Sequence, residues 1–202
     1  MEGPLVNLVF PRHPGARPVL TWAVFGVTAV TTALGVLLPG FTQALARTPG
    51  FFHGQWWRLA SPILVNPEGW HQVVFNGLML LVVGAAAERV LGRLRWAVLY
   101  AAGALAGNAV GYLTGQYSAG SSVAVAGLAG GLAVWVLTGR AGLPAPPRLA
   151  AGALLAGAVA LAVIGDNHGL PLLSGALLGA VFLRTMRVVP SLTDLRPRRT
   201  SA

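Results

Sequence analysis

The chain has 202 residues, of which 55% are hydrophobic and only 9% are charged, and its mean hydropathy is +0.69. A soluble domain carries about a quarter charged residues, so this composition excludes an ordinary soluble protein and indicates a helical membrane protein. The absence of cysteine excludes disulfides, zinc–thiolate sites and thiol nucleophiles. All 14 basic residues are arginines that fall between the apolar segments, so the net charge of +9 indicates membrane topology and not a nucleic-acid surface.

The apolar segments are long enough to cross a hydrocarbon core, which takes about 20 residues. We expect an all-α polytopic bundle at residues 18–187, with six spans at about 18–39, 72–91, 96–115, 121–138, 149–165 and 169–187. An N-terminal segment, 1–17, lacks a signal-peptide cleavage pattern, and a short basic tail, 188–202, is expected to be mobile. The long connection after the first span is rich in aromatic residues, which favour the interface, so we expect it to lie partly in the membrane surface.

The arginines predict the orientation of these spans. With six spans, twelve arginines fall on one side of the membrane, and only Arg47 and Arg58 fall on the other. The positive-inside rule then places both termini in the cytoplasm of a multi-pass protein of the cell membrane.

Glycines recur at helical spacing in the third, fourth and sixth expected spans, which is typical of close helix–helix contact. The residues are Gly103, Gly107, Gly111, Gly127, Gly130, Gly131, Gly175 and Gly179. We therefore expect these three spans to lie closest together.

Polar residues at span ends are the functional candidates. Glu88, beside Arg89 at the cytoplasmic end of the second span, is expected to form a surface ion pair. Ser122 and His168 each begin a span that runs inward, so both are expected at the outer face. A serine that begins a helix is commonly a cap, and an interfacial histidine is commonly only solvated.

Amide donors open the second span from the same face: Gln72 and Asn76, with His71 as a neighbour. A serine, a histidine and donors at one level can form a hydrolytic site, in which the histidine takes the serine proton and the donors stabilise an oxyanion.

The start of the last span, 166-DNHGLPLLSGALLG-179, carries the candidate base. Pro171 lacks an N–H, so it is tolerated only in the first turn of a helix. Asn167 as the N-cap would make His168 the first helical residue, and Asp166 is a candidate to orient the imidazole.

A Trp-Arg pair stands at Trp57-Arg58, and Gly84, Glu88 and Gly92 are spaced as G-x-x-x-E-x-x-x-G. Together with the serine and histidine described above, these motifs, which extend along most of the chain, resemble the rhomboid family of intramembrane serine proteases. The stretch 120-GSSVAVAGLAGG-131 resembles the nucleophile motif G-x-S-G when Ser122 is the nucleophile, which leaves Ser121 as a plain cap.

The resemblance implies a Ser122–His168 dyad with Asn76 and Gln72 (or His71) as oxyanion donors. It also implies transmembrane protein substrates within the lipid bilayer, and neither metal nor cofactor. Three positions depart from the family pattern. Val123 replaces the glycine after the serine and is expected to widen the gap between the serine and histidine helices. Leu172 stands at the family's histidine position, with His168 four residues earlier. Gln72 replaces an oxyanion histidine.

These departures leave two alternatives open. One is an active protease, and the other is a catalytically inactive rhomboid-like pseudoprotease that binds transmembrane clients. A transporter or channel is disfavoured because the spans show no inverted repeat and few intramembrane charges.

Overall fold

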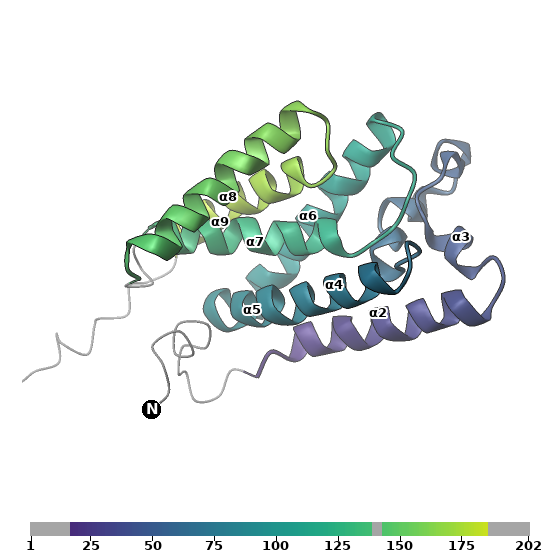
Figure 1. Ribbon diagram of the computed structural model, residues 1–202, viewed down its shortest axis with the longest axis horizontal. Helices are drawn as coiled ribbons and strands as arrows, with labels where there is room; N and C mark the ends of the chain where they lie inside the picture. The colour runs from purple at the N-terminus through teal and green to yellow at the C-terminus, as the bar shows by residue number, and fades with distance from the viewer. Residues whose placement is uncertain (1–16, 139–142, 186–202) are drawn as a thin grey trace, which may run out of the picture.

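The computed structural model describes residues 17–138 and 143–185, and within these residues the protein is a bundle of helices joined by loops (Figure 1). The long helices are α2 (Val19–Leu37), α6 (Arg93–Leu113), α7 (Ser122–Leu137), α8 (Ala145–Val163) and α9 (Gly169–Thr185). A further continuous helix is formed by α4 (Trp70–Met79), the π-helical turn η4 (Leu80–Gly84) and α5 (Ala85–Leu91). The two predicted terminal segments lie outside the described residues, except for Arg17.

In the part of the chain that the structure describes, four helices are long and apolar enough to cross a membrane: α2, the α4–α5 unit, α6 and α8. Two further apolar helices, α7 and α9, are shorter, with 16 and 17 described residues, at the lower limit of the length that spans a hydrocarbon core. The helical membrane bundle predicted from the sequence is therefore present, and the number of membrane crossings stays a prediction.

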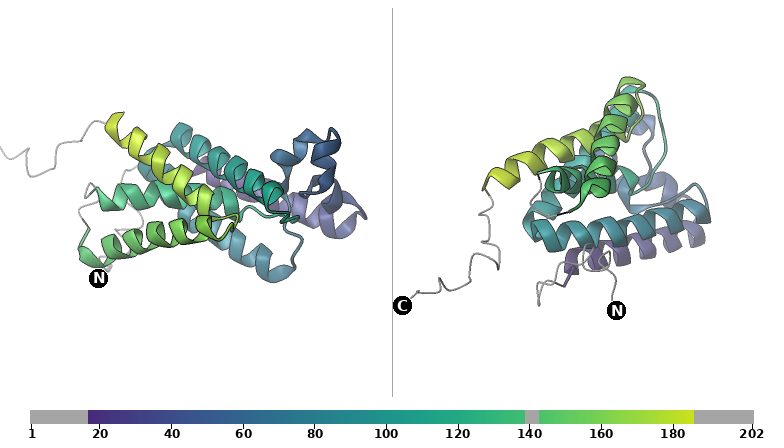
Figure 2. Two further views of the ribbon diagram at one scale, coloured as in Figure 1. Left: turned by 90° about the horizontal axis from the view of Figure 1, so that it is seen from above. Right: turned by 60° about the vertical axis from the view of Figure 1, so that its left-hand side comes forward.

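The middle of the bundle is formed by α6, α7 and α9, which pack on one another through glycines. A Cβ on Gly103 would lie 2.9 Å from Gly127 Cα, and a Cβ on Gly179 would lie 2.8 Å from Gly131 Cα. These helices approach until backbone meets backbone, so the predicted closeness of the three spans is confirmed. Helix α8 packs on α9 and α7 at the side of this centre (Figure 2).

Helix α2 is held at its first turn by Glu88 of α5. The carboxylate accepts hydrogen bonds from the backbone N–H groups of Leu20 (3.0 Å) and Thr21 (2.8 Å), and from the Thr21 hydroxyl (2.9 Å). The first N–H groups of a helix have no partner within it, and the helix dipole favours an anion there. Glu88 is only 4% exposed, so the prediction that it lies at the surface is wrong.

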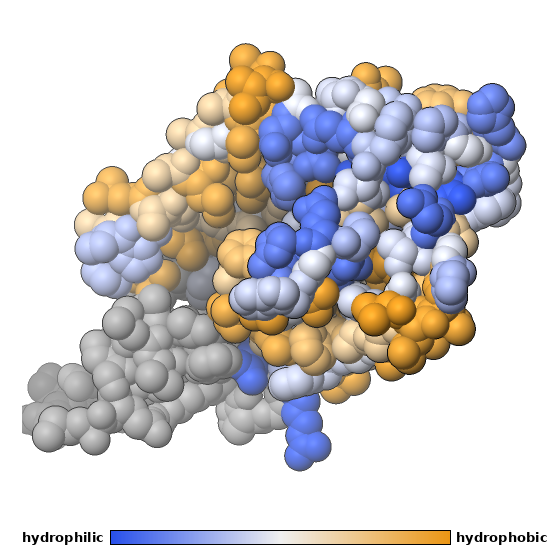
Figure 3. Space-filling view, turned by 45° about the vertical axis from the view of Figure 1, so that its right-hand side comes forward, coloured by the Kyte–Doolittle hydropathy of each residue, from blue (hydrophilic) through white to orange (hydrophobic). Residues whose placement is uncertain are grey.

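The connection between α2 and α4 forms a short helix, α3 (Phe41–Leu45), and three 3₁₀ turns, η1 (Pro49–His53), η2 (Trp56–Leu59) and η3 (Ser61–Leu64). Buried Arg58 organises it, because its Nη1 donates to the carbonyls of Gln43 and Ala46, each at 2.6 Å. Figure 3 is turned so that the end of the molecule that carries this connection faces the viewer. Hydrophilic residues gather at this end, and hydrophobic residues cover much of the sides of the bundle.

Candidate active site

Ser122 and His168 lie together, although 46 residues separate them in the sequence. His168 Nε2 is 2.9 Å from Ser122 Oγ, which is hydrogen-bonding distance. Ser122 is the first residue of α7, and His168 directly precedes α9. The glycine contacts between these two helices therefore set how far apart the two side chains stand.

Asp166 lies on the far side of the imidazole. Its Oδ1 is 2.9 Å from His168 Nδ1 and also accepts a hydrogen bond from the His168 backbone N–H at 2.8 Å. A carboxylate only accepts hydrogen bonds, so Nδ1 carries the proton and Nε2 is left to accept from the serine hydroxyl. Burial raises the pKa of Asp166, but the two hydrogen bonds from His168 and the electrostatic attraction to that residue together outweigh it and lower the pKa below its ordinary value. Asp166 is therefore ionised at neutral pH.

His168 reaches Ser122 from a turn and not from a helix face. Helix α9 begins at Gly169, the expected start of the sixth span and one residue after the start that Asn167 as N-cap would give, with Pro171 at its third position, where the missing N–H costs no helical bond. Leu172, which stands at the family's histidine position, is buried, and its carbonyl lies where a Cβ on Gly130 would collide at 2.0 Å. The turn before α9 therefore places the His168 imidazole beside Ser122, although the position that the family resemblance assigns to the histidine is occupied by Leu172.

Val123 fits beside the dyad because Gly107 faces it from α6. Val123 is 2% exposed, and a Cβ added to Gly107 would lie only 2.5 Å from Val123 Cβ. The extra carbon atoms of the valine therefore occupy space that a glycine leaves free. The widening expected from a β-branched residue does not separate the Ser122 and His168 side chains.

A cavity of about 310 Å³ opens beside the dyad. Its lining is mostly polar and includes Ser122, His168, Asn167, Gln72, Gln116 and Arg47. A polar cavity of this size has room for several water molecules.

The two expected amide donors converge on the turn before Ser122. A Cβ on Gly120 would lie 2.9 Å from Gln72 Nε2 and 3.3 Å from Asn76 Nδ2. Gln72 Nε2 also donates to the Ala119 carbonyl at 2.9 Å. His71 is exposed and meets the Trp70 ring edge-to-face. Of the three expected donors, Gln72 lines the cavity, whereas His71 and the buried Asn76 are not among its lining residues.

Ser121 does not cap α7. It occupies the N-cap position, but its side chain makes no cap hydrogen bond, and its buried Oγ has no hydrogen-bond partner among the residues that the structure describes. The sequence prediction of a plain cap is wrong, because the backbone of Ser121 is already helical and directs the hydroxyl toward α2.

Two polar residues near the site have no sequence signal that marks them. Asn66 accepts a 2.7 Å hydrogen bond from Asn76 Nδ2. Arg47 is 4% exposed and bonds Asn108 Oδ1 and the Gln116 carbonyl, and burial lowers its pKa from the ordinary arginine value. Both residues lie in an irregular connection, where no periodicity indicates which side chains turn inward.

A family model described as the Rhomboid domain matches residues 53–187. The chain is 36% identical over 84 residues to "Putative rhomboid protease YdcA" of Bacillus subtilis (strain 168), a match that covers 40% of this chain and 42% of that protein. It is 38% identical over 88 residues to "Rhomboid protease GluP" of the same organism, which covers 43% of this chain and 17% of that protein. The matches thus span less than half the length of either relative.

Proposed function

The chain belongs to the rhomboid family, and we propose on this premise that it is an intramembrane serine endopeptidase. Its proposed substrates are membrane proteins, cleaved at peptide bonds in or near their transmembrane segments. The observation that carries this proposal is the 2.9 Å distance between Ser122 Oγ and His168 Nε2, with Asp166 on the other ring nitrogen.

In the proposed reaction His168 Nε2 takes the proton of Ser122 as Oγ attacks the scissile carbonyl carbon. The side-chain amides of Gln72 and Asn76 donate to the oxyanion of the tetrahedral intermediate. His168 then gives its proton to the leaving amine, and an acyl-enzyme remains on Ser122. A water molecule, deprotonated by His168, hydrolyses this ester and restores the serine.

We place the protein in the cell membrane with both termini in the cytoplasm and the dyad toward the outer face. The support is the arginine bias, twelve against two. The two exceptions, Arg47 and Arg58, are 4% and 8% exposed and bond loop carbonyls or an amide, so they have a structural use that explains their presence on that side.

The proposal is tested with the full-length protein in detergent, treated with a fluorophosphonate probe that reacts with activated serines. We expect labelling of the wild type and its loss in Ser122→Ala, because the probe bonds to Oγ. The matched control is Ser121→Ala, which removes the neighbouring hydroxyl and is expected to retain labelling. Labelling that persists in Ser122→Ala would exclude Ser122 as the nucleophile.

Cleavage is measured in parallel with a reconstituted protein that carries one transmembrane segment. A catalytically inactive, client-binding relative would retain that protein equally well in the wild type and in Ser122→Ala, and would produce no fragments from either. Fragments that depend on Ser122 distinguish the protease from this alternative.

A further inference from the structure

Asn76, a proposed oxyanion donor, is itself held by a second buried side chain. Its Nδ2 donates to Asn66 Oδ1 at 2.7 Å, and the two residues are 3% and 8% exposed. An amide nitrogen carries two hydrogens, so this bond uses one and leaves the other for the turn at Gly120, which Nδ2 approaches closely. The bond to Asn66 therefore selects which end of the Asn76 amide faces the site.

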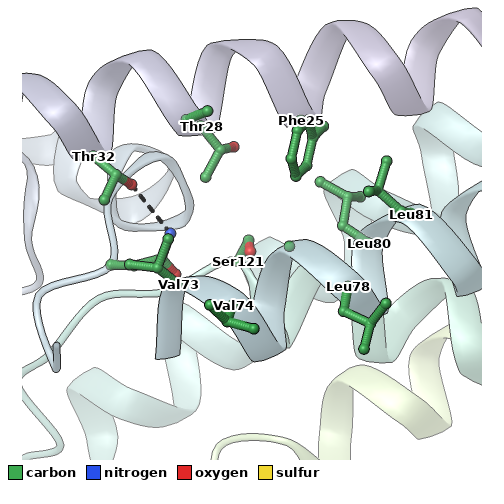
Figure 4. A pocket seen from close by; sticks show the side chains of 12 residues that line it. Phe25, Thr28, Thr32, Val73, Val74, Leu78, Leu80, Leu81 and Ser121 are labelled. Atoms are coloured by element: carbon green, nitrogen blue, oxygen red, sulfur yellow. Dashed lines mark hydrogen bonds between the residues drawn. The ribbon is translucent and has the colours of Figure 1, made fainter. Parts of the chain in front are cut away.

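Asn66 is in turn held by α2. Asn66 Nδ2 donates to Thr32 Oγ1 at 3.3 Å, and the hydroxyl of the neighbouring Thr31 donates to the Leu64 carbonyl. Figure 4 shows Thr32 pointing from α2 toward α4, with the bond to the Asn66 amide as a dashed line. Two consecutive threonines of α2 thus fix the short segment that carries Asn66.

This polar link runs along a cleft between α2 and α4. The cleft has a volume of about 320 Å³ and a largely apolar lining that includes Phe25, Val73, Val74 and Leu78 (Figure 4). Thr28 and Ser121 also face it, and within residues 17–138 and 143–185 their buried hydroxyls have no hydrogen-bond partner. Because the two helices are separated here, hydrogen bonds and not backbone contact join α2 to the site.

We infer that Asn66 is a positioning residue for the oxyanion donor Asn76, and that α2 supports it through Thr32. Without the Asn66 oxygen, the Asn76 side-chain amide is free to rotate by about 180° about its Cβ–Cγ bond. Its own carbonyl oxygen then replaces the N–H group near the oxyanion, where it repels the developing negative charge. The inference rests on the proposed proteolytic function and extends it to α2, which precedes the residues matched by the family model.

The test is a double-mutant cycle on Ser122-dependent cleavage by the full-length protein in proteoliposomes. Asn66→Leu keeps the approximate size of the side chain and removes the acceptor. Losing a donor from an oxyanion site typically costs about 10²–10³ in kcat, so a misoriented donor is expected to lower kcat by about 10–100-fold, with KM changed less than about twofold.

In the Asn76→Ala background the same Asn66→Leu change is expected to cost less than about twofold, because the donor that it orients is already absent. A merely structural role for Asn66 would lower activity equally in both backgrounds. Equal losses would therefore overturn the inference.

A milder pair of variants applies even if Asn66→Leu does not fold. Thr32→Val removes the hydroxyl that holds Asn66 and is expected to lower kcat by about threefold, an effect that should disappear with Asn76→Ala. The matched control Thr28→Val removes an unpaired hydroxyl one turn away on α2 and is expected to leave kcat unchanged. Equal rates for Thr32→Val and Thr28→Val would overturn the role of α2.

A wild-type protein without Ser122-dependent cleavage or labelling would refute the proposed function and this inference with it. If the wild type is active but the losses in kcat from Asn66→Leu and Asn76→Ala simply add in the double variant, only the inference about Asn66 is refuted.

Discussion

Helices α7 and α9 meet through their backbones, whereas α2 and α4 meet through side chains. A Cβ on Gly175 of α9 would lie 1.9 Å from the Gly127 carbonyl oxygen of α7, so no side chain fits between them. Between α2 and α4 there is instead a cleft of about 320 Å³, with the Thr32–Asn66 hydrogen bond beside it. The first contact is made by backbone against backbone. The second is made by side chains, both apolar (Phe25 of α2 against Gly77 of α4) and polar (Thr32 with Asn66).

The difference separates the two halves of the candidate site. Ser122 begins α7 and His168 precedes α9, so the spacing of the dyad is fixed by contact between backbones. Asn76 lies on α4, and its orientation is fixed by hydrogen bonds that extend to α2. We therefore expect substitutions at the contact between α7 and α9 to lower stability and disturb the dyad together. Substitutions that affect α2 are expected to lower either the stability or the reaction rate, depending on which end of the helix they affect.

The largest expected effect is that of Gly175→Ala. The added Cβ would collide with a backbone carbonyl, which cannot rotate away, so α7 and α9 must move apart at a cost of roughly 3 kcal/mol. The measurements are thermal unfolding in detergent and fluorophosphonate labelling, and both are expected to fall. The matched control is Gly26→Ala on α2, which meets no atom within 4 Å and is expected to be neutral or stabilising by up to about 1 kcal/mol. Similar melting temperatures for the two variants would contradict the backbone-contact account.

An intermediate effect is expected from Val123→Gly, which restores the family's usual residue. Here the valine fills space left by Gly107, so its removal leaves a cavity and adds a flexible helical residue, at a cost of about 2 kcal/mol. Gly107→Ala alone should also destabilise, because its Cβ would lie 2.5 Å from Val123 Cβ.

Combined with Val123→Gly, the Gly107→Ala change should cost less than it does in the wild type. Unfolding of the four proteins measures this coupling. If the losses in the free energy of unfolding of the two single variants simply add in the double variant, the side chains at positions 107 and 123 do not compete for the same space.

The smallest expected loss is from Glu88→Gln, about 1–2 kcal/mol. Glutamine has one acceptor oxygen, whereas Glu88 accepts from three groups of α2 through two oxygens. The rate of labelling at Ser122 should change little, because this attachment is at the opposite end of α2 from Thr32.

The matched control for stability is Glu68→Gln, which removes the same charge from an exposed residue and keeps an oxygen that can accept from the Ser118 hydroxyl, so the free energy of unfolding should change by less than about 0.5 kcal/mol. Because Glu68 lines the cavity beside the dyad, this variant is compared for stability and not for labelling. A large loss of labelling in Glu88→Gln without a loss of stability would contradict the expectation that Glu88, at the first turn of α2, supports stability while Thr32, near the other end, supports the reaction rate.

Several features of the bundle follow directly from the chain. Apolar segments of membrane length predict helices, since a backbone in hydrocarbon must satisfy its own hydrogen bonds. The spacing of Gly103, Gly127 and Gly175 predicts which helices touch, because only small residues allow such an approach. Ser122 and His168 were also candidates from the sequence, since each begins a predicted inward-running span and the rhomboid motif register selects Ser122, and Asp166 was a candidate to orient the imidazole.

Other features depend on neighbours that are distant in the chain. Val123 appears disruptive until Gly107 of another helix is seen opposite it. Glu88 reads as a surface residue next to an arginine, but α2 covers it. Asn66 lies in an irregular segment with no periodicity to show that it faces Asn76.

The sequence by itself determined the helical membrane class and the glycine-lined helix contacts, because composition and periodicity are local properties of the chain, and its resemblance to the rhomboid motifs pointed to Ser122 and His168 as the candidate dyad. Only the tertiary structure decided that the turn before α9 places His168 Nε2 2.9 Å from Ser122 Oγ, and that α2 reaches Asn76 through Asn66. Both arrangements depend on distances between residues far apart in the chain, which are set by how whole helices pack and not by local sequence pattern.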